Sequence, residues 1–466
     1  MNLTLDEITK AVTGRFEGTA AETKVRGYSI DSRTMSAGEL FFAIKGPRFD
    51  GHDFVGQVLE KKAAAAVVDE RWKPSAGLTS PVIRVKSTDL ALQDLARDVR
   101  RRWGMPIVGI TGSAGKTTTK ELTAAILGKK YTVLRSVGNL NNSYGLPLAM
   151  LRVERYQSFG VLEMGMSAKG EIRQLASIAE PNQGVVTNVN PVHLEFFKSV
   201  DEIAEAKAEL IEGLHEPRIA YLNNDDSRVR AMARKFTGKI VTYGVKSVAS
   251  FKVQQFQDLG LDGSAFTVHH GRRDVNFVLP LLGTHNVANA LAAIAVGITN
   301  EVSWDQAREA VAEMKPEKMR GVVVKFREGF VVIDDSYNSN PKALTEMIRF
   351  VGRLQGVQRK IIVAGEMLEL GPEGAEMHRA CGREAAKAGA ALIVGVQGQG
   401  NEFVSGAQEA GADLSRLKFV RDAVQAGDFL ARTVHKGDVV LIKGSRGVKL
   451  EQALNTLRAQ FSSMEV

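Results

Sequence analysis

Short apolar runs alternate with amphipathic stretches along most of the chain. The runs at 106–112, 160–165 and 184–189 combine β-branched residues with glycine, whereas apolar residues between them recur at the spacing of helices. Buried strands that alternate with helices are typical of a parallel sheet that helices cover. The pattern therefore predicts an α/β fold, in which ligands bind at the carboxyl ends of the strands.

Changes in this pattern divide the 466 residues into three predicted domains. Residues 1–103 contain short apolar runs and end in an amphipathic helix, which predicts a small N-terminal α/β domain. Residues 104–314 carry the alternation described above, interrupted at 251–270 by a segment that alternates like antiparallel strands. Residues 315–466 contain four more buried runs between helices, which predicts a Rossmann-like domain, and we expect a hinge near Lys315-Pro316.

Composition narrows the class of protein. The net charge is +8, but the basic residues are not gathered into an arm, so we expect no nucleic-acid partner. A single cysteine, Cys381, makes an intramolecular disulfide impossible and fits a reducing compartment. The N-terminal stretch carries acidic side chains and no apolar core, so we expect no signal peptide, and no run approaches the roughly 20 apolar residues of a membrane span. The sequence predicts a cytoplasmic protein.

The segment VGITGSAGKTTTKEL joins a predicted strand to a predicted helix through two glycines. Gly112 and Gly115 allow the backbone to curl so that several N–H groups point to one place, and the start of the helix adds partial positive charge. Lys116 supplies a full charge for phosphate oxygens, and the Thr117 hydroxyl suits Mg²⁺. Ile110 stands where the strict P-loop pattern has glycine, and an ordinary strand–turn–helix junction is the alternative interpretation. The predicted phosphate site comprises Gly112, Ser113, Ala114, Gly115, Lys116, Thr117 and Thr118.

Three further residues are candidate metal ligands or catalytic groups. Glu163 ends a buried strand with a carboxylate, the oxygen ligand that Mg²⁺ prefers. His193 follows the next strand in a polar segment, and Lys207 lies near the apolar stripe of a predicted helix. Each also has an ordinary structural interpretation: an exposed carboxylate, a hydrogen-bonded histidine, and a lysine whose aliphatic stem is buried. The residues by themselves leave both interpretations open.

Polar clusters also follow strands in the second half of the chain. Asn286 and Asn289 lie on one face at the start of a predicted helix, where they can bind a base or cap the helix. Asp334 and Asp335 leave a buried strand and can hold a ribose or a metal, or belong to a capping loop. The segment KGSRG after the last strand offers two cations to a carboxylate or phosphate. These clusters predict a magnesium–nucleotide enzyme with two facing α/β domains.

Together these segments resemble the Mur ligases, the ATP-dependent amide-forming enzymes that build the peptide of peptidoglycan. The resemblance extends, in order, over essentially the whole chain through TGSAGKTTTK, LEMGMSAKGEI, TNVNPVHLEFF, AKAEL, GTHNVANALAA, DDSYNSNP and KGSRG. Within the family, DDSYNSNP most resembles the member that adds D-alanyl-D-alanine, and SIDSRTMSAGELFFAIKGPRFDGHDF resembles a uridine-nucleotide domain. The Asp-Asn-Pro-Arg signature of the member that adds the third amino acid is absent from this sequence.

The resemblance implies a catalytic centre with two metal ions. Lys116 is implied to hold the ATP phosphates, and Thr117 and Glu163 to hold a first Mg²⁺. His193 is implied to hold a second Mg²⁺ together with Lys207, the lysine that family members carbamylate. A carbamate turns this cation into a carboxylate-like anion, which explains a lysine where the chemistry would otherwise want an acid.

The resemblance also implies binding residues outside the P-loop. Asn286 is implied to face adenine, and Arg320 and Asp335 to meet the phosphate and ribose of ATP. The implied substrate contacts are Ser32, Arg33, Lys45, Gly46 and His52 for the UDP-muramoyl group, and Asn338, Asn340, Lys443 and Arg446 for the amino substrate.

The reaction that the resemblance implies joins D-Ala-D-Ala to UDP-N-acetylmuramoyl tripeptide through an acyl phosphate, with ATP and two Mg²⁺, in a protein that we expect to be a monomer. A sister ligase that adds the third amino acid is one alternative, against which the absent signature and DDSYNSNP argue. Folylpolyglutamate synthetase is another, against which the N-terminal segment argues. A non-catalytic nucleotide switch is the third, against which the candidate metal ligands argue.

Overall fold

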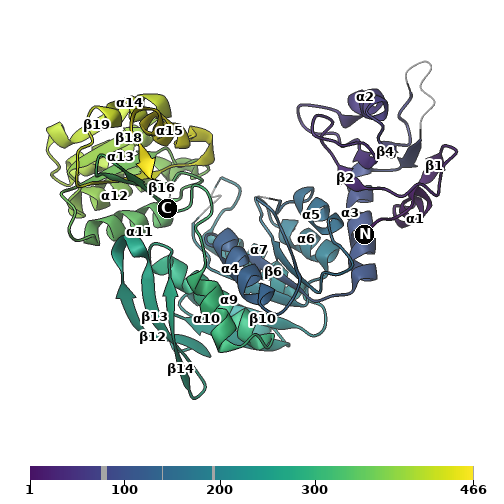
Figure 1. The fold of residues 1–466 in the computed structure, drawn as a ribbon, viewed down its shortest axis with the longest axis horizontal. Helices are drawn as coiled ribbons and strands as arrows, with labels where there is room; N and C mark the ends of the chain where they lie inside the picture. Colours follow the sequence, from purple (N-terminus) through teal and green to yellow (C-terminus); the bar gives the residue numbers. More distant parts are fainter. Residues whose placement is uncertain (75–80, 139, 192–194, 465–466) are drawn as a thin grey trace.

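The structure, a computed structural model, describes residues 1–74, 81–138, 140–191 and 195–464. These residues form three sheets with helices packed against them, as predicted for a three-domain α/β protein. Figure 1 shows the central sheet between the other two, with the N-terminus in the domain on one side and the C-terminus in the domain on the other. None of the described helices is long and apolar enough to cross a membrane.

The N-terminal domain contains a five-stranded sheet. Its elements are α1 (Leu5–Ala11), β1 (Arg15–Glu17), β2 (Gly27–Ser29), β3 (Glu39–Phe42), α2 (Val55–Glu60), β4 (Ala65–Asp69), β5 (Val82–Val85) and α3 (Thr88–Trp103), with the strands in the order β1-β5-β4-β3-β2. The predicted closing helix is confirmed as α3, which begins at the Ser87 cap and ends at Gly104 in the left-handed conformation. Arg100 of α3 donates to the Ala179 carbonyl oxygen of the central domain at 2.7 Å and so connects the two domains.

The central domain contains a nine-stranded sheet. Its strands are β6 (Ile107–Thr111), β7 (Val133–Arg135), β8 (Phe159–Glu163), β9 (Gln183–Val186), β10 (Ile219–Asn223), β11 (Lys239–Gly244), β12 (Phe251–Asp258), β13 (Ser264–His270) and β14 (Arg273–Leu279), in the order β14-β13-β12-β11-β10-β9-β6-β8-β7. The antiparallel segment predicted at 251–270 is confirmed as β12 and β13, and β14 extends it. Strand β6 lies between β8 and β9 and runs parallel to both, so the carboxyl ends of these three strands meet at one edge.

Helices of the central domain pack against its sheet and against one another. They are α4 (Lys116–Gly128), α5 (Gly145–Leu151), α6 (Glu171–Ala179), α7 (Val200–Glu212), α8 (Ser227–Met232), α9 (Thr284–Thr299) and α10 (Trp304–Ala312). Helix α9 is almost entirely apolar because it is buried against α4 and the sheet. Gly297 of α9 has no room for a side chain, since a Cβ there would lie 2.3 Å from Cγ2 of Ile126. This close approach joins the C-terminal ends of α9 and α4, and Gly115 and Asn289 lie similarly close at the other ends of the two helices.

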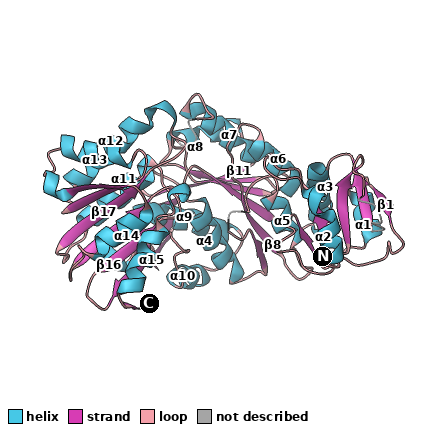
Figure 2. Ribbon diagram, turned by 90° about the horizontal axis from the view of Figure 1, so that it is seen from above, coloured by secondary structure: helices cyan, strands magenta, loops and turns pink. Residues whose placement is uncertain are grey.

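The C-terminal domain contains a seven-stranded sheet in the order β19-β18-β17-β20-β16-β15-β21. Its elements are β15 (Val322–Phe326), β16 (Val331–Asp335), α11 (Pro341–Arg353), β17 (Arg359–Gly365), α12 (Gly374–Lys387), β18 (Leu392–Val396), α13 (Gly400–Glu409), β19 (Leu417–Val420), α14 (Ala423–Ala431), β20 (Asp438–Lys443), α15 (Glu451–Gln460) and β21 (Ser463–Met464). The four predicted strands are confirmed as β16, β17, β18 and β20, which are parallel neighbours. Figure 2 shows α11, α12 and α13 on one face of this sheet and α14 and α15 on the other.

Candidate functional site

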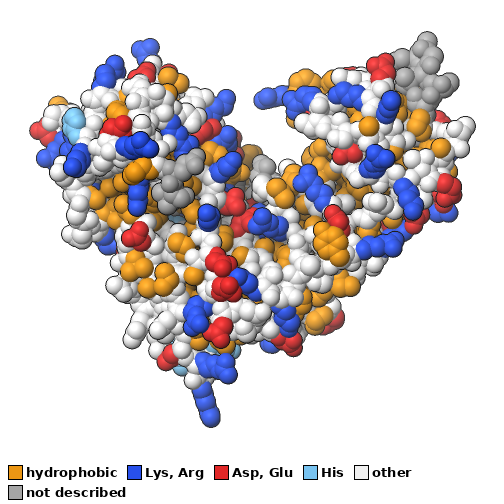
Figure 3. Space-filling model, in the orientation of Figure 1, with side chains coloured by type: hydrophobic (Ala, Val, Ile, Leu, Met, Phe, Trp, Pro, Cys, Tyr) orange, Lys and Arg blue, Asp and Glu red, His pale blue; other side chains and the backbone are white. Residues whose placement is uncertain are grey.

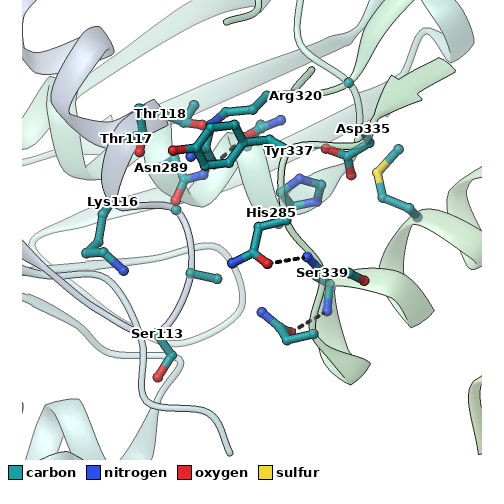
Figure 4. Close-up of a pocket in the computed structure, with 18 of the residues that line it drawn as sticks. Ser113, Lys116, Thr117, Thr118, His285, Asn289, Arg320, Asp335, Tyr337 and Ser339 are labelled. Atoms are coloured by element: carbon teal, nitrogen blue, oxygen red, sulfur yellow. Dashed lines mark hydrogen bonds between the residues drawn. The ribbon is translucent and has the colours of Figure 1, made fainter. Parts of the chain in front are cut away.

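A cavity lies between the central and C-terminal domains, where the carboxyl ends of strands from both sheets face each other. Figure 4 shows the P-loop residues and the start of α9 on one side, and side chains of the C-terminal domain on the other. The cavity brings together most of the predicted ATP-binding residues with part of the predicted amino-substrate set. The predicted residues that line it are Ser113, Ala114, Gly115, Lys116, Thr117, Thr118, Glu163, Asn286, Arg320, Asp335, Asn338, Asn340 and Lys443.

The two glycines of the P-loop are required by backbone conformation and by space. Gly112 has φ +151° and Gly115 has φ +82°, in the region that side chains disfavour. A Cβ on Gly112 would lie 1.8 Å from Oγ1 of Thr187, and one on Gly115 would lie 2.2 Å from Oδ1 of Asn289. The loop can therefore take its tight curve only with glycine at both positions.

The loop after β9 supports the P-loop from behind, which the sequence did not reveal. The Ala114 N–H donates to Oδ1 of Asn188 at 2.9 Å, and Nδ2 of Asn188 donates to the Ala114 carbonyl oxygen at 3.1 Å. The Ser113 N–H donates to the Asn188 carbonyl oxygen, and Oγ of Ser113 accepts from the Asn190 N–H, both at 2.9 Å. Asn188 thus acts as a scaffold for the backbone of Ser113 and Ala114.

Lys116 lies in a partly buried position at the start of α4. Its Nζ donates to the Gly112 carbonyl oxygen of its own loop at 2.9 Å. Burial lowers the pKa of Lys116, Glu163 opposes that shift by raising it, and Arg320 adds to the lowering. Since its acceptor is a neutral carbonyl, the ammonium group is available to an anion that enters the cavity.

Glu163 is the centre of an oxygen-rich group at the end of β8. Its Oε2 accepts from Oγ1 of Thr117 at 2.8 Å, and its Oε1 accepts from Nδ2 of Asn141 at 2.8 Å. Its backbone N–H donates to Oγ of Ser136 at 3.0 Å. Asn141 was not predicted, although the polar run NLNNS after β7 is a signal that could have identified it. Carboxylate, hydroxyl and amide oxygens suit Mg²⁺, although the described residues contain no cluster of three His, Cys, Asp or Glu side chains that could bind a metal.

Lys207 lies on α7 with only 2% of its surface exposed. Burial, together with the positive charge of Lys116, holds the pKa of Lys207 well below its ordinary value. Lys207 does not line the cavity. His193, the other predicted ligand of the second metal, lies outside the described residues.

The C-terminal domain contributes a network at the end of β16. Lys443 donates through Nζ to Oδ2 of Asp335 at 2.7 Å and to the Asn338 carbonyl oxygen at 3.0 Å. The guanidinium carbon of Arg320 lies 4.1 Å from the centre of the Tyr337 ring, an arrangement that favours a cation–π interaction. Tyr337 was not predicted as a site residue, and Lys443, which was predicted to bind substrate, here holds Asp335 and its loop.

The start of α9 carries the predicted adenine-binding group. Nδ2 of Asn286 donates to the Leu282 carbonyl oxygen at 2.9 Å, and Nδ2 of Asn289 donates to Oδ1 of Asn286 at 3.0 Å. His285 lines the same cavity, and burial lowers its pKa. The amide groups are thus fixed by hydrogen bonds to each other and to the backbone.

The remaining predicted amino-substrate residues differ in position. Asn340 caps α11, because its Oδ1 accepts from the Ala343 N–H at 2.9 Å, and it lines the cavity. Arg446 does not line the cavity, and its Nη1 lies 2.8 Å from Oε1 of Glu451 on the surface.

The residues predicted to meet the uridine nucleotide lie in the N-terminal domain, and none lines this cavity. His52 is held at both ring nitrogens, with Nδ1 2.6 Å from Oδ1 of Asp50 and Nε2 accepting from the Asp69 N–H at 2.9 Å. Arg33 is exposed and pairs with Asp31, whose pKa falls to about 2. Figure 3 shows a wide hollow between the N-terminal and C-terminal domains, with Lys and Arg side chains along its edges. The residues predicted to contact the uridine nucleotide are Ser32, Arg33, Lys45, Gly46 and His52.

Models of known protein families match residues in all three domains of the chain. The family model described as "Mur ligase family, catalytic domain" matches residues 24–100. The model described as "Mur ligase middle domain" matches residues 110–297, and the one described as "Mur ligase, glutamate ligase domain" matches residues 319–446. The matches follow one another in the order of the three sheets.

Similar proteins extend over almost the full chain. The UDP-N-acetylmuramoyl-tripeptide–D-alanyl-D-alanine ligase of Bacillus subtilis is 34% identical, over 97% of this chain and 98% of that protein. A crystal structure of MurF from Acinetobacter baumannii superposes with a TM-score of 0.88 at 28% identity, over 98% of this chain and 99% of that one. The MurF ligase of Thermotoga maritima in complex with ADP superposes with a TM-score of 0.83 at 29% identity, over 94% and 98%.

Proposed function

Because the chain belongs to the Mur ligase family of ATP-dependent amide-forming enzymes, we propose that it joins D-alanyl-D-alanine to a UDP-N-acetylmuramoyl tripeptide. The product is the UDP-linked pentapeptide precursor of peptidoglycan. The observation that carries the proposal is the cavity in which the P-loop and Glu163 face Asp335 and Lys443 of the C-terminal domain. A carboxylate, a triphosphate and an amine can meet there because groups from two domains converge.

The P-loop residues are proposed to hold the phosphates of ATP. Two glycines curl the backbone before α4, the first N–H groups of α4 have no side-chain cap, and Lys116 adds a full positive charge. Asn286 is proposed to face adenine, Arg320 a phosphate and Asp335 the ribose. The hydrogen bond from Lys443 supports the role of Asp335, because it fixes the carboxylate at the cavity wall.

The oxygen groups around Glu163 fit Mg²⁺. Thr117 Oγ1 and Glu163 Oε2 are 2.8 Å apart, and Mg²⁺ usually combines one or two protein oxygens with phosphate oxygens and water. We assign a first Mg²⁺ to Thr117 and Glu163, and a second to His193 and a carbamylated Lys207. Bound metal ions would neutralise phosphate charge during transfer.

The environment of Lys207 supports its carbamylation. Only the neutral amine reacts with CO₂, and burial together with the Lys116 charge favours the neutral form. The reaction forms an N–C bond and releases one proton, which leaves a carboxylate-like anion. Lys116, which repels a protonated Lys207, would then attract the anion.

The substrate-binding roles of the outer domains are also proposals. We assign the UDP-muramoyl group to residues 1–103, ATP to residues 104–314 and the amino substrate to residues 315–466, with the hinge near Lys315-Pro316. We expect a monomer in the cytoplasm. The assigned contacts are Ser32, Arg33, Lys45, Gly46 and His52 for the nucleotide, and Asn338, Asn340, Lys443 and Arg446 for the amino substrate.

The proposed reaction has two steps. The terminal carboxylate of the tripeptide attacks the γ-phosphorus of ATP, which forms an acyl phosphate and releases ADP. The amine of D-Ala-D-Ala attacks the acyl carbon, the bond to phosphate breaks, and the amine loses a proton as the amide forms. Lys116 offsets the repulsion between carboxylate and triphosphate, and closure of the C-terminal domain excludes water from the acyl phosphate.

A mass-spectrometric ligation assay tests this proposal. We expect a pentapeptide product only when ATP, a UDP-muramoyl tripeptide and D-Ala-D-Ala are all present, and tripeptides ending in diaminopimelate or lysine should both be offered. Lys116→Ala should remain folded and make no product, because it loses a phosphate contact and little packing. Ligation of a third amino acid to a UDP-muramoyl dipeptide would favour the sister ligase instead. ATP hydrolysis that ignores both substrates would favour a nucleotide switch.

A further inference from the structure

A second cavity lies beside the P-loop, between the central domain and α11. Its central-domain wall includes Asn188 and Asn190, and its C-terminal wall includes Lys342 and Glu346 of α11. The two cavities share Ala114, Gly115, His285, Asn289 and Ala343, so a small molecule can extend from one toward the other along the P-loop.

Lys342 in this second cavity has no carboxylate partner in the described part of the chain. Its Nζ donates to Oδ1 of Asn190, a neutral amide, at 3.0 Å. Glu346 lies four residues further along α11, at the spacing that usually forms an ion pair with a lysine. The Glu346 carboxylate instead lies 3.6 Å from Nδ1 of His285. The Lys342 charge therefore remains available to a ligand.

The position of Lys342 in α11 is unfavourable for the helix itself. Lys342 is the second residue of α11, and the first turn of this helix contains no acidic side chain. The N-terminal end of a helix carries partial positive charge, so a lysine there costs stability, whereas an acid would add to it. A residue that opposes its local structure without compensation indicates a functional constraint.

Three of the other four lysine and arginine residues that line the two cavities have assigned or local partners. Lys443 is paired with Asp335 at 2.7 Å, and Arg320 stacks on Tyr337. Lys116 lies in the P-loop and is assigned to phosphate. Lys246 is the remaining candidate; it is exposed, and its backbone N–H donates to Oδ1 of Asp225 at 3.0 Å.

We propose that the Lys342 ammonium group binds the C-terminal carboxylate of the incoming dipeptide, an inference that rests on the proposed ligase function. A dipeptide spans about 7 Å, so its carboxylate can lie at Lys342 while its amine points along the P-loop toward the acyl phosphate. Lys342 then selects amino substrates that end in a free carboxylate. Because it lies on the C-terminal domain and also contacts Asn190, it would hold the dipeptide at the interface of the two domains.

The test compares D-Ala-D-Ala with D-alanyl-D-alaninamide, which has the same amine and no terminal charge. Wild-type enzyme should show a KM about 10- to 100-fold lower for the acid than for the amide, as expected for one charge-assisted hydrogen bond. Lys342→Met should raise the KM for the acid to that of the amide, leave the KM for the amide and for ATP unchanged, and leave kcat unchanged. Lys342→Arg should restore most of the preference.

The controls separate this inference from its alternatives. Lys246→Met, the same change at the other unassigned cation of the cavity, should leave both KM values unchanged. Equal use of acid and amide by the wild type, or loss of the preference in Lys246→Met instead, would overturn the assignment to Lys342. A Lys342→Met variant that loses kcat equally with both dipeptides would assign the lysine a purely structural role. If the wild type ligates neither dipeptide, the ligase proposal itself fails.

Discussion

Replacing Glu163 by Gln isolates the contribution of one buried negative charge beside the P-loop. The Glu163 side chain is almost completely buried, and its two oxygens accept hydrogen bonds of 2.8 Å from Thr117 and Asn141. Glutamine has nearly the same shape, and rotation of the Asn141 amide would let both hydrogen bonds re-form. The change therefore removes the charge and keeps the packing.

The magnitude follows from this geometry. Each retained hydrogen bond contributes about 0.5–1.5 kcal/mol, so we expect the free energy of unfolding to change by no more than about 1 kcal/mol. Loss of a preorganised charged group in a reaction centre typically costs about 10²–10³-fold in kcat, or about 3–4 kcal/mol. Removing this carboxylate also removes the interaction that raises the pKa of Lys116. The expected result is a folded protein with a large catalytic defect.

The assay measures ATP- and dipeptide-dependent phosphate release as a function of Mg²⁺ concentration, beside a urea titration of the same variant. Glu163→Gln should require more Mg²⁺ and reach a lower kcat, whereas Glu205→Gln on the exposed face of α7 should behave like the wild type. If Glu163→Gln keeps kcat within about threefold at every Mg²⁺ concentration, the reasoning about this carboxylate is wrong.

Three other predictions test separate parts of the structure. Lys207→Ala should lose ligation and partly regain it when a small carboxylate is added, and normal ligation by the variant would contradict the carbamate. Gly115→Ala should raise the KM for ATP and destabilise the protein, because its Cβ would lie 2.2 Å from Asn289, whereas Gly170→Ala meets nothing within 4 Å and is the matched control. Isothermal titration with ATP measures the difference, and equal affinity in the two variants would be inconsistent with the P-loop geometry. Burial lowers the pKa of His378, whose Nε2 accepts a hydrogen bond from the Met367 N–H at 2.8 Å. Below about pH 6.5 the unfolded chain therefore binds more protons than the folded chain. The free energy of unfolding should fall as pH decreases through that range. Urea titrations from pH 5 to pH 7.5 should show this slope in the wild type and a flatter one in His378→Gln, and parallel slopes would exclude His378 as the cause.

Much of the fold could be predicted because buried strands and the P-loop have local signatures. The runs that became β6, β8, β9, β16, β17, β18 and β20 are apolar over most of their length, since helices or neighbouring strands cover them. The two P-loop glycines, Lys116 and Thr117 lie within six residues, so a local pattern suffices to identify them. These features needed no knowledge of how distant segments meet.

Partners that are distant in the chain could not be predicted in this way. Asn188 supports Ala114 across 74 residues, and Lys443 holds Asp335 across 108 residues. A polar residue after a strand gives the same local sequence pattern whether it caps a helix, fixes a carboxylate or faces a ligand. These roles differ only in which group from another part of the chain, or which ligand, lies opposite the side chain.

The sequence by itself determined that this chain is a three-domain α/β protein in which a glycine-rich turn joins a strand to a helix, because hydrophobic spacing and glycine placement act over a few residues. Only the tertiary structure decided that Asn141 and Thr117 share the Glu163 carboxylate, and that Lys342 reaches Asn190 across 152 residues. The first contact depends on how β8 and α4 pack within the central domain, and the second on how the central and C-terminal domains face each other. Hydrogen bonds of about 3 Å are set by that packing and not by local spacing.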